Sequence, residues 1–405
     1  MVSVCVVGGG TSGSAAAAEA SARGAEVTVV EKAERPDPPW KSWPDLIRAI
    51  PLRFEAPPPK WSLPLPDRTV EDEARSVAEG EVVTSEGTLR PDRVVLATGC
   101  SFEPPKFLGR RKPGVAVLES FREYERLGRE SSSTGEITVT GEGGRGLEVA
   151  ERLSGPGKHV NLFVSHWKGG PPSSMVLDVI SSAASERGVS VTSGTVAKAL
   201  GATRLEAVLA NDRVFACDTM VYVPRKLPRT IRVPAEAGPL GGHLVDQNLR
   251  TSIPSVFAAG GCAELEGQRP PRTFEDEPAL SGRMAGSNCT GDEQQMGRVK
   301  TTESFVFGLL WCRIETLSLR PPSVAPLSTV ARRWDESSAC EINFESSTKR
   351  VVRVESVERS GPIGLPRLPV PSEMSLQSLA YGLGSSDISL ISETARSGVA
   401  RWQEC

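Results

Sequence analysis

Three glycines near the N-terminus stand in the spacing G-x-G-x-x-G: Gly8, Gly10 and Gly13. In this spacing the first glycine permits a tight turn, the second lets the backbone approach a pyrophosphate, and the third permits close packing of a helix on a sheet. The N–H groups at the start of such a helix favour a bound phosphate, because they form the positive end of the helix dipole. The pattern therefore predicts a phosphate-binding turn for a dinucleotide.

The elements around this turn follow in the expected order. Residues 3–7 are apolar, as in a buried strand of a parallel sheet, and residues 15–22 are alanine-rich, as in a helix. Residues 26–30 predict a second strand, which ends in Glu31, eighteen residues past Gly13. A carboxylate at this position can accept hydrogen bonds from an adenosine ribose. The alternative, a glycine-rich turn without a ligand, would not require this order of elements.

The same glycine spacing recurs 133 residues further on (141 minus 8), at Gly141, Gly143 and Gly146. Residues 136–140 predict the strand before it, and residues 160–164 predict the strand after its helix. This second strand ends without an acid and runs into Ser165, His166 and Lys168. A carboxylate would repel a 2′-phosphate, whereas a hydroxyl and cationic side chains would accept one, so the segment favours NADP(H) over NAD(H). The alternative is that these three are solvated loop residues.

Two further segments predict buried strands that end in small residues. The first, D-R-V-V-L-A-T-G, ends at Thr98 and Gly99, and the second, T-S-I-P-S-V-F-A-A-G-G-C-A-E, contains Gly260 and Gly261. In this order, the four segments resemble the pyridine nucleotide-disulfide oxidoreductase superfamily, FAD- and NAD(P)-dependent flavoproteins with two dinucleotide-binding domains. The segment G-L-E-V-A, residues 146–150, also resembles the start of a helix in the nicotinamide domain of that family.

The resemblance implies an α/β fold with two Rossmann-like domains. It implies a discontinuous FAD-binding domain, residues 1–105 and 236–295, with an inserted NAD(P)-binding domain, residues 106–235. Residues 296–405 would then form a C-terminal α+β domain similar to the dimerisation domain of the family. A homodimer is the implied assembly.

Patterns within the C-terminal region are weaker. Residues 301–358 predict a helical stretch followed by strands, with residues 349–354 alternating as at a sheet edge. Residues 372–397 have the apolar spacing of a further helix.

The glycine patterns and the resemblance together predict which residues contact the cofactors. The predicted FAD contacts are Gly8, Gly10, Thr11, Ser12, Gly13, Glu31, Lys32, Thr98, Gly99, Gly260 and Gly261. The predicted contacts of the nicotinamide dinucleotide are Gly141, Gly143, Gly146, Glu148, Ser165, His166 and Lys168.

Lys41 and Glu148 are the catalytic candidates. The segment around Lys41 resembles the P-P-L-S-K stretch of ferredoxin-reductase-type members, in which a lysine near flavin N5 pairs with the glutamate of the G-L-E helix. A cation beside N5 would stabilise the anionic reduced flavin. Here the lysine stands one position early, and the alternative is a surface lysine in a proline-rich loop.

Three departures from the family limit the chemistry. No cysteine lies between Glu31 and Ala97, and Ser42 stands near the place where single-cysteine members hold theirs, so dithiol exchange through the usual centre is excluded. Gly261 replaces the aspartate of A-A-G-D, and the lost charge-assisted hydrogen bond would cost about 1.5–3 kcal/mol of flavin binding. Residues 223–228, V-P-R-K-L-P, replace a glycine-led turn.

Composition excludes several other classes. The 405 residues carry a formal net charge of -3, which gives no electrostatic reason to expect nucleic acid. No apolar run is long enough for a membrane span, and no signal-peptide pattern opens the chain, so a cytoplasmic protein is expected. The eight cysteines and three histidines are scattered without metal-ligand spacing, so no metal is expected.

The sequence therefore predicts a FAD-dependent NAD(P)H oxidoreductase without a redox disulfide. Its acceptor would be dioxygen, a quinone-like compound or a small electron-transfer protein. Two alternatives stay open: a non-catalytic descendant that acts as a binding or assembly protein, and the flavin subunit of a larger dehydrogenase complex.

Overall fold

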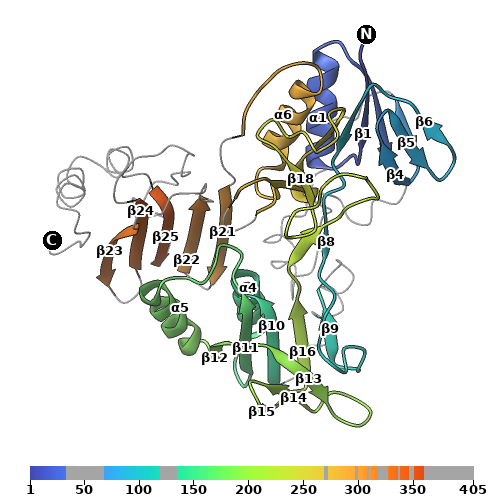
Figure 1. Cartoon of the computed structure of the whole chain (residues 1–405). Helices are drawn as coiled ribbons and strands as arrows, with labels where there is room; N and C mark the ends of the chain where they lie inside the picture. Colours follow the sequence, from blue (N-terminus) through green and yellow to red (C-terminus); the bar gives the residue numbers. More distant parts are fainter. Residues whose placement is uncertain are drawn as a thin grey trace, which may run out of the picture.

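A computed structural model of the chain describes residues 1–32, 68–118, 127, 135–268, 272–296, 300–307, 310–317, 327–335, 338–345 and 351–359. Two parallel five-stranded sheets and one antiparallel five-stranded sheet organise these residues (Figure 1). Within them, no helix is both long and apolar enough to cross a membrane. The predictions for Lys41, Ser42 and residues 372–397 lie outside the described residues.

The first parallel sheet has the strand order β19-β7-β1-β2-β3. Its strands are β1 (Ser3–Val7), β2 (Glu26–Glu31), β3 (Thr69–Glu71), β7 (Arg93–Leu96) and β19 (Val256–Ala258). The central strands are valine-rich because both faces of the sheet are covered. Helices α1 (Thr11–Ala22) and α6 (Pro278–Asn288) lie beside each other next to this sheet (Figure 1).

The second parallel sheet repeats this arrangement with the order β12-β11-β10-β16-β9. Its strands are β9 (Val115–Val117), β10 (Glu136–Glu142), β11 (His159–His166), β12 (Val189–Ser193) and β16 (Thr219–Val223). Helix α4 (Gly143–Leu153) follows β10, as α1 follows β1, and α5 (Ser174–Glu186) follows β11. Each sheet thus places a glycine-rich turn at the carboxyl end of its central strand, which is where α/β sheets bind ligands.

Smaller sheets complete two α/β bodies. The N-terminal body is built on the first parallel sheet, and the inserted body is built on the second. A three-stranded sheet in the N-terminal body contains β4 (Ala74–Ala78), β5 (Glu81–Thr84) and β6 (Thr88–Leu89), and a parallel pair contains β18 (His243–Val245) and β20 (Ala263–Leu265). The inserted body adds β13 (Val196–Leu200), β14 (Ala207–Ala210) and β15 (Arg213–Ala216).

The two connections between these bodies lie side by side. The outgoing strand β8 (Cys100–Phe102) pairs antiparallel with the returning strand β17 (Lys226–Pro228). The substituted segment at residues 223–228 therefore ends in this pair, where Pro228 lies opposite Cys100. The domain boundaries predicted near residues 105 and 236 remain a proposal.

The described part of the C-terminal region is an antiparallel sheet of the order β21-β22-β25-β24-β23. Its strands are β21 (Lys300–Phe307), β22 (Leu310–Leu317), β23 (Leu327–Asp335), β24 (Ser338–Glu345) and β25 (Val351–Arg359). The helical stretch predicted from residue 301 is wrong, because residues 300–307 form the strand β21, which pairs antiparallel with β22. The edge position predicted for residues 349–354 is also wrong where described, since β25 lies in the middle of the sheet.

This sheet packs on the inserted body. Val357 of β25 and Ala339 of β24 belong to the same buried apolar cluster as Leu153 of α4 and Ile180 of α5. Figure 1 shows the sheet beside these two helices.

Helices α1 and α6 join the two distant segments of the N-terminal body by backbone contact. A Cβ atom at Gly282 would overlap the carbonyl oxygen of Ser12, and one at Gly286 would overlap that of Ala16. Only glycine lets the helices lie this close.

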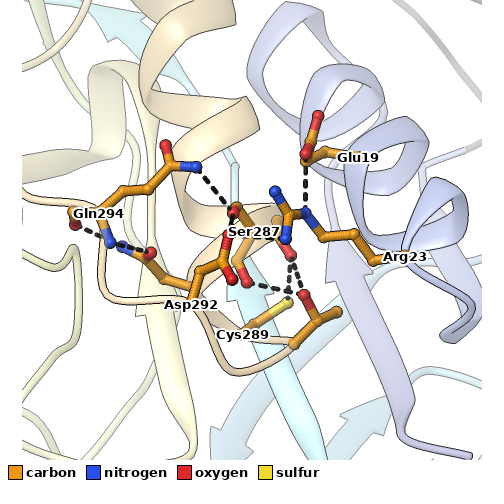
Figure 2. Close-up of polar contacts among 9 residues, drawn as sticks. Glu19, Arg23, Ser287, Cys289, Asp292 and Gln294 are labelled. Atoms are coloured by element: carbon orange, nitrogen blue, oxygen red, sulfur yellow. Dashed lines mark hydrogen bonds and ion pairs between the residues drawn. The ribbon is translucent and has the colours of Figure 1, made fainter.

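A polar network holds the other end of the same helix pair (Figure 2). Arg23 at the end of α1 binds Glu19 at 2.8 Å and Asp292 at 2.6 Å. Asp292 accepts a hydrogen bond of 2.7 Å from Ser287 of α6, whose hydroxyl accepts one of 3.0 Å from Gln294. The network therefore connects α1 to the loop after α6.

Gly286→Ala tests the helix contact. The added methyl group meets a backbone carbonyl that cannot rotate away, so we expect a loss of about 1–3 kcal/mol in the free energy of unfolding. Urea unfolding followed by circular dichroism measures it. Gly87→Ala is the matched control, because no atom of the described part of the chain lies within 4 Å of a Cβ at Gly87. Equal stability of the two variants would contradict the close contact.

Candidate functional site

The first glycine turn has the geometry that its spacing predicts. Gly8 has a φ of 104°, in the left-handed region, and lies against the backbone of Ala97. Gly13 lies against the carbonyl of Gly8, which brings α1 close to the sheet. A Cβ at Gly10, the residue before α1, would have no atom of the described residues within 4 Å. Among the residues that the structure describes, none fills the space in front of the α1 N-terminus, where a ligand would bind.

Glu31 completes this turn. It ends β2 and its carboxylate accepts a hydrogen bond from the N–H of Gly9. Two predicted contacts on α1 differ in exposure, since Thr11 is exposed and Ser12 is buried. Lys32 is exposed and pairs with Glu73 at 2.8 Å. The open helix end and the carboxylate fit the pyrophosphate and adenosine ribose of FAD.

The returning segment, residues 251–264, lies against the same helix end. Gly260 has a φ of 71° and lies against the side chain of Ser12. Its N–H donates a hydrogen bond of 3.1 Å to Ser281 of α6. The β7 end lies nearby, where Thr98 donates a hydrogen bond to the carbonyl of Arg229 and Gly99 has a φ of 74°.

Gly261 has a partner that the sequence analysis missed. A Cβ at Gly261 would overlap Sγ of Cys100, while the next atoms, Gly99 C and Cys100 Cβ, would lie at 3.5 and 3.6 Å. The sulfur of Cys100 therefore occupies the space beside Gly261 that a larger residue would fill. The pattern T-G-C at residues 98–100 places a cysteine after β7, but nothing near Gly261 in the sequence indicates that the two residues meet.

Cys100 lines a cavity of about 250 Å³ at the β8–β17 crossing. The cavity also receives side chains from the β11 end, from β17 and from residues 272–276. Burial and the neighbouring Glu275 carboxylate raise the pKa of Cys100 to about 12. The group is therefore a thiol at neutral pH, which makes it a poor nucleophile.

Lys168 connects two bodies at this cavity. Its ammonium lies 2.9 Å from Glu275 and also binds Asp276, and all three side chains are less than one-fifth exposed. Burial alone would lower the pKa of Lys168, but the two carboxylates outweigh it and raise the pKa. The ammonium of Lys168 is therefore paired with two carboxylates of the segment before α6.

The other residues predicted to accept a 2′-phosphate also have partners. Ser165 donates a hydrogen bond of 3.0 Å to the carbonyl of Gly141, and its oxygen lies 3.0 Å from Nδ1 of His166. Burial and the Arg225 guanidinium lower the pKa of His166 to about 4, so the ring is neutral at pH 7. Strand β11 ends in Val164, Ser165 and His166, so β11 itself brings no acid to this end, and Glu142 of β10 lies opposite His166.

The second glycine turn repeats the first in part. Gly141 has a φ of 131° and lies against Val223, and Gly146 packs on Leu162. A Cβ at Gly143, the first residue of α4, would lie 2.5 Å from Cδ2 and 2.7 Å from Cε2 of Trp167. The turn is thus formed, but an indole covers the helix end to which a pyrophosphate would bind.

Two glutamates belong to this turn and its helix. Glu142 is buried, pairs with Arg145 at 3.3 Å, and has a raised pKa because of its burial. Glu148 is buried on α4. Lys41 lies outside the described residues, so its pairing with Glu148 stays a prediction. Among the described residues, no cluster of three or more His, Cys, Asp or Glu could hold a metal ion.

A family profile for pyridine nucleotide-disulphide oxidoreductases matches residues 65–280, and one for FAD dependent oxidoreductases matches residues 3–40. A nitric oxide reductase FlRd-NAD(+) reductase from Aliivibrio fischeri is 28% identical over 184 residues, which are 44% of this chain and 48% of that protein. An NADH oxidase from Methanocaldococcus jannaschii is 25% identical over 222 residues, 52% of this chain and 49% of that protein. The chain thus spans about half the length of these curated relatives.

Solved structures show the same fold. A NAD-dependent persulfide reductase from A. fulgidus matches with a TM-score of 0.76 and 20% identity, over 98% of this chain and 84% of that one. The covalent putidaredoxin reductase-putidaredoxin complex matches with a TM-score of 0.69 and 18% identity, over 88% of this chain and 89% of that one.

Gly261→Ala tests the complementarity with Cys100. The methyl group must displace Sγ from its rotamer, so we expect a loss of about 1 kcal/mol in the free energy of unfolding. The double variant with Cys100→Ala removes the overlap and should regain most of this loss. A double-mutant cycle from urea unfolding measures the coupling. Additive effects would contradict the contact.

Proposed function

Because the chain belongs to the pyridine nucleotide-disulphide oxidoreductase family, we propose that it is a FAD-dependent NAD(P)H oxidoreductase that works without a redox-active disulfide. The open N-terminus of α1, with Glu31 beside it, is the observation that carries this proposal. When bound, the flavin would supply hydride and electron transfer, so the protein needs no nucleophile of its own.

The residues of the first turn have the roles that FAD binding requires. The N–H groups of the first turn of α1 would hold the pyrophosphate, and bare Gly10 gives the phosphates room to approach. The carboxylate of Glu31 would exchange the N–H of Gly9 for ribose hydroxyls. Gly260 and Ser12 keep the returning segment against this helix end.

The described cysteines support a mechanism without thiol chemistry. Burial raises the pKa of Cys5, Cys100 and Cys289 to about 12, so these groups stay protonated at neutral pH. Dithiol exchange requires a thiolate, which these sites disfavour.

For the acceptor we propose a small electron-transfer protein. The matched FlRd-NAD(+) reductase and the complex of putidaredoxin reductase with putidaredoxin support this choice. The NADH oxidase match supports dioxygen as the second candidate. We retain a homodimer as the proposed assembly.

For the donor we propose NADPH over NADH. Support comes from the end of β11, where Val164 and Ser165 bring no carboxylate toward a 2′-phosphate. The preference rests on this missing repulsion alone, because Lys168 is paired and His166 is neutral.

Flavin binding is tested by the visible spectrum of the purified protein. We expect flavin bands that bleach on anaerobic addition of NADPH. Glu31→Gln should weaken FAD binding tenfold or more, since a hydrogen bond to a charged group contributes about 1.5–3 kcal/mol. Glu26→Gln, at the other end of β2, is the matched control. Protein that stays colourless after incubation with FAD would refute the proposal and favour the non-catalytic descendant.

Donor preference is tested by Ser165→Glu, at an exposed position. The new carboxylate should repel the 2′-phosphate and lower kcat/KM for NADPH about tenfold more than for NADH. Steady-state assays with ferricyanide as the acceptor give both values. An equal change for the two donors would place the adenosine ribose away from Ser165.

A further inference from the structure

The two glycine turns differ at one matched position. Gly10 and Gly143 are the middle glycines of their spacings and adjoin the first turns of α1 and α4. No described residue lies in front of Gly10, whereas the ring carbons of Trp167 fill the space in front of Gly143. The same motif is therefore accessible in one body and covered in the other.

The indole covers the surface that a dinucleotide needs. In this motif the middle glycine is bare so that a pyrophosphate can approach the backbone. Trp167 lies at this approach because it directly follows His166, the last residue of β11. It is partly buried against the apolar cluster of α4 and α5. The indole thus occupies the space beside Gly143 that the motif leaves clear for a pyrophosphate.

The loop that begins with Trp167 is held from two sides. Toward the N-terminal body, Lys168 binds Glu275 and Asp276, and Arg272 donates a hydrogen bond of 2.5 Å to the carbonyl of Lys168.

On the other side, Arg353 of β25 donates hydrogen bonds to the same loop. Its guanidinium reaches the carbonyls of Gly169 at 2.9 Å, Gly170 at 3.2 Å and Pro171 at 2.7 Å. Both neighbouring bodies thus hold the loop in the position in which its tryptophan covers α4.

We propose that Trp167 is a lid on the second dinucleotide site, and that a nicotinamide dinucleotide binds only after the indole has left Gly143. This inference rests on the proposed function, since it assumes that the inserted body binds NAD(P)H. The ion pairs of Lys168 with Glu275 and Asp276 hold this lid in its closed position. The lid lowers the apparent affinity by the fraction of molecules in which it is open.

Trp167→Ala removes the lid. We expect the Kd for NADPH, measured by isothermal titration calorimetry on the full-length protein, to fall about tenfold or more, which corresponds to a lid open in about one tenth of molecules or fewer. Phe215→Ala is the matched control, because the ring centroid of Phe215 lies 5.1 Å from that of Phe163, in a different apolar cluster of the same body from the one on which Trp167 packs. A similar gain in this control would assign the effect to general loosening and overturn the lid.

A second measurement leaves Trp167 in place. In protein labelled with 5-fluorotryptophan, the ¹⁹F resonance of Trp167 is identified by its loss in Trp167→Phe. Saturating NADPH should shift this resonance as the indole leaves Gly143. An unchanged resonance in protein that binds NADPH would overturn the proposal, even where Trp167→Ala does not fold.

The outcomes separate the lid from the proposed function. If wild type and Trp167→Ala bind NADPH with equal affinity, the lid is wrong and the proposed function stands. If neither protein binds NADPH or NADH although both bind FAD, the lid and the nicotinamide part of the proposed function both fail. Tighter binding by Trp167→Ala supports both.

Discussion

The backbone contact between α1 and α6 is the constraint on which the first site depends. Gly282 and Gly286 let α6 lie directly on the carbonyls of Ser12 and Ala16. This contact brings the returning segment to the N-terminus of α1, where Gly260 lies against Ser12. The position of a phosphate-binding turn depends on the position of the helix that follows it, because the pyrophosphate binds at the N-terminus of this helix. The glycines of α6 therefore position a turn that lies more than two hundred residues earlier in the chain.

Charged side chains have a comparable role at the junction of the three sheets. Lys168, Glu275 and Asp276 lose water on folding and are stable there because the ammonium of Lys168 pairs with both carboxylates. Removal of one partner would leave an uncompensated buried charge, which is more costly than the loss of an exposed ion pair. The junction is therefore fixed by electrostatics, whereas α1 and α6 are fixed by packing.

The sequence predicted the features that depend on local backbone conformation, namely the two glycine turns and the elements beside them. Gly8, Gly13 and Gly141 are glycines because of the turn itself, so their spacing indicated the strands and helices around them. Contacts between distant segments were not predictable in this way. Gly261 suggested a lost flavin contact, but nothing local indicated that the sulfur of Cys100 fills the space.

The same limit explains the two wrong predictions. Apolar spacing in the C-terminal region fitted a helix or a strand, and only the pairing of β21 with β22 decides for the strand. The edge position of residues 349–354 failed because strand order depends on partners remote in sequence. Trp167 gave no clue at all, because a loop residue can turn its ring in any direction that the surrounding fold permits.

The pairing of β7 with β19 also dictates an order of assembly during synthesis. β7 ends at Leu96 and β19 begins at Val256, so the ribosome must add about 160 residues (256 minus 96) before the first sheet is complete. At about 5–20 residues per second this takes on the order of ten to thirty seconds. The inserted body is synthesised in that interval and can fold first. Until then one edge of β7 is unpaired, and such edges are prone to pair with other chains.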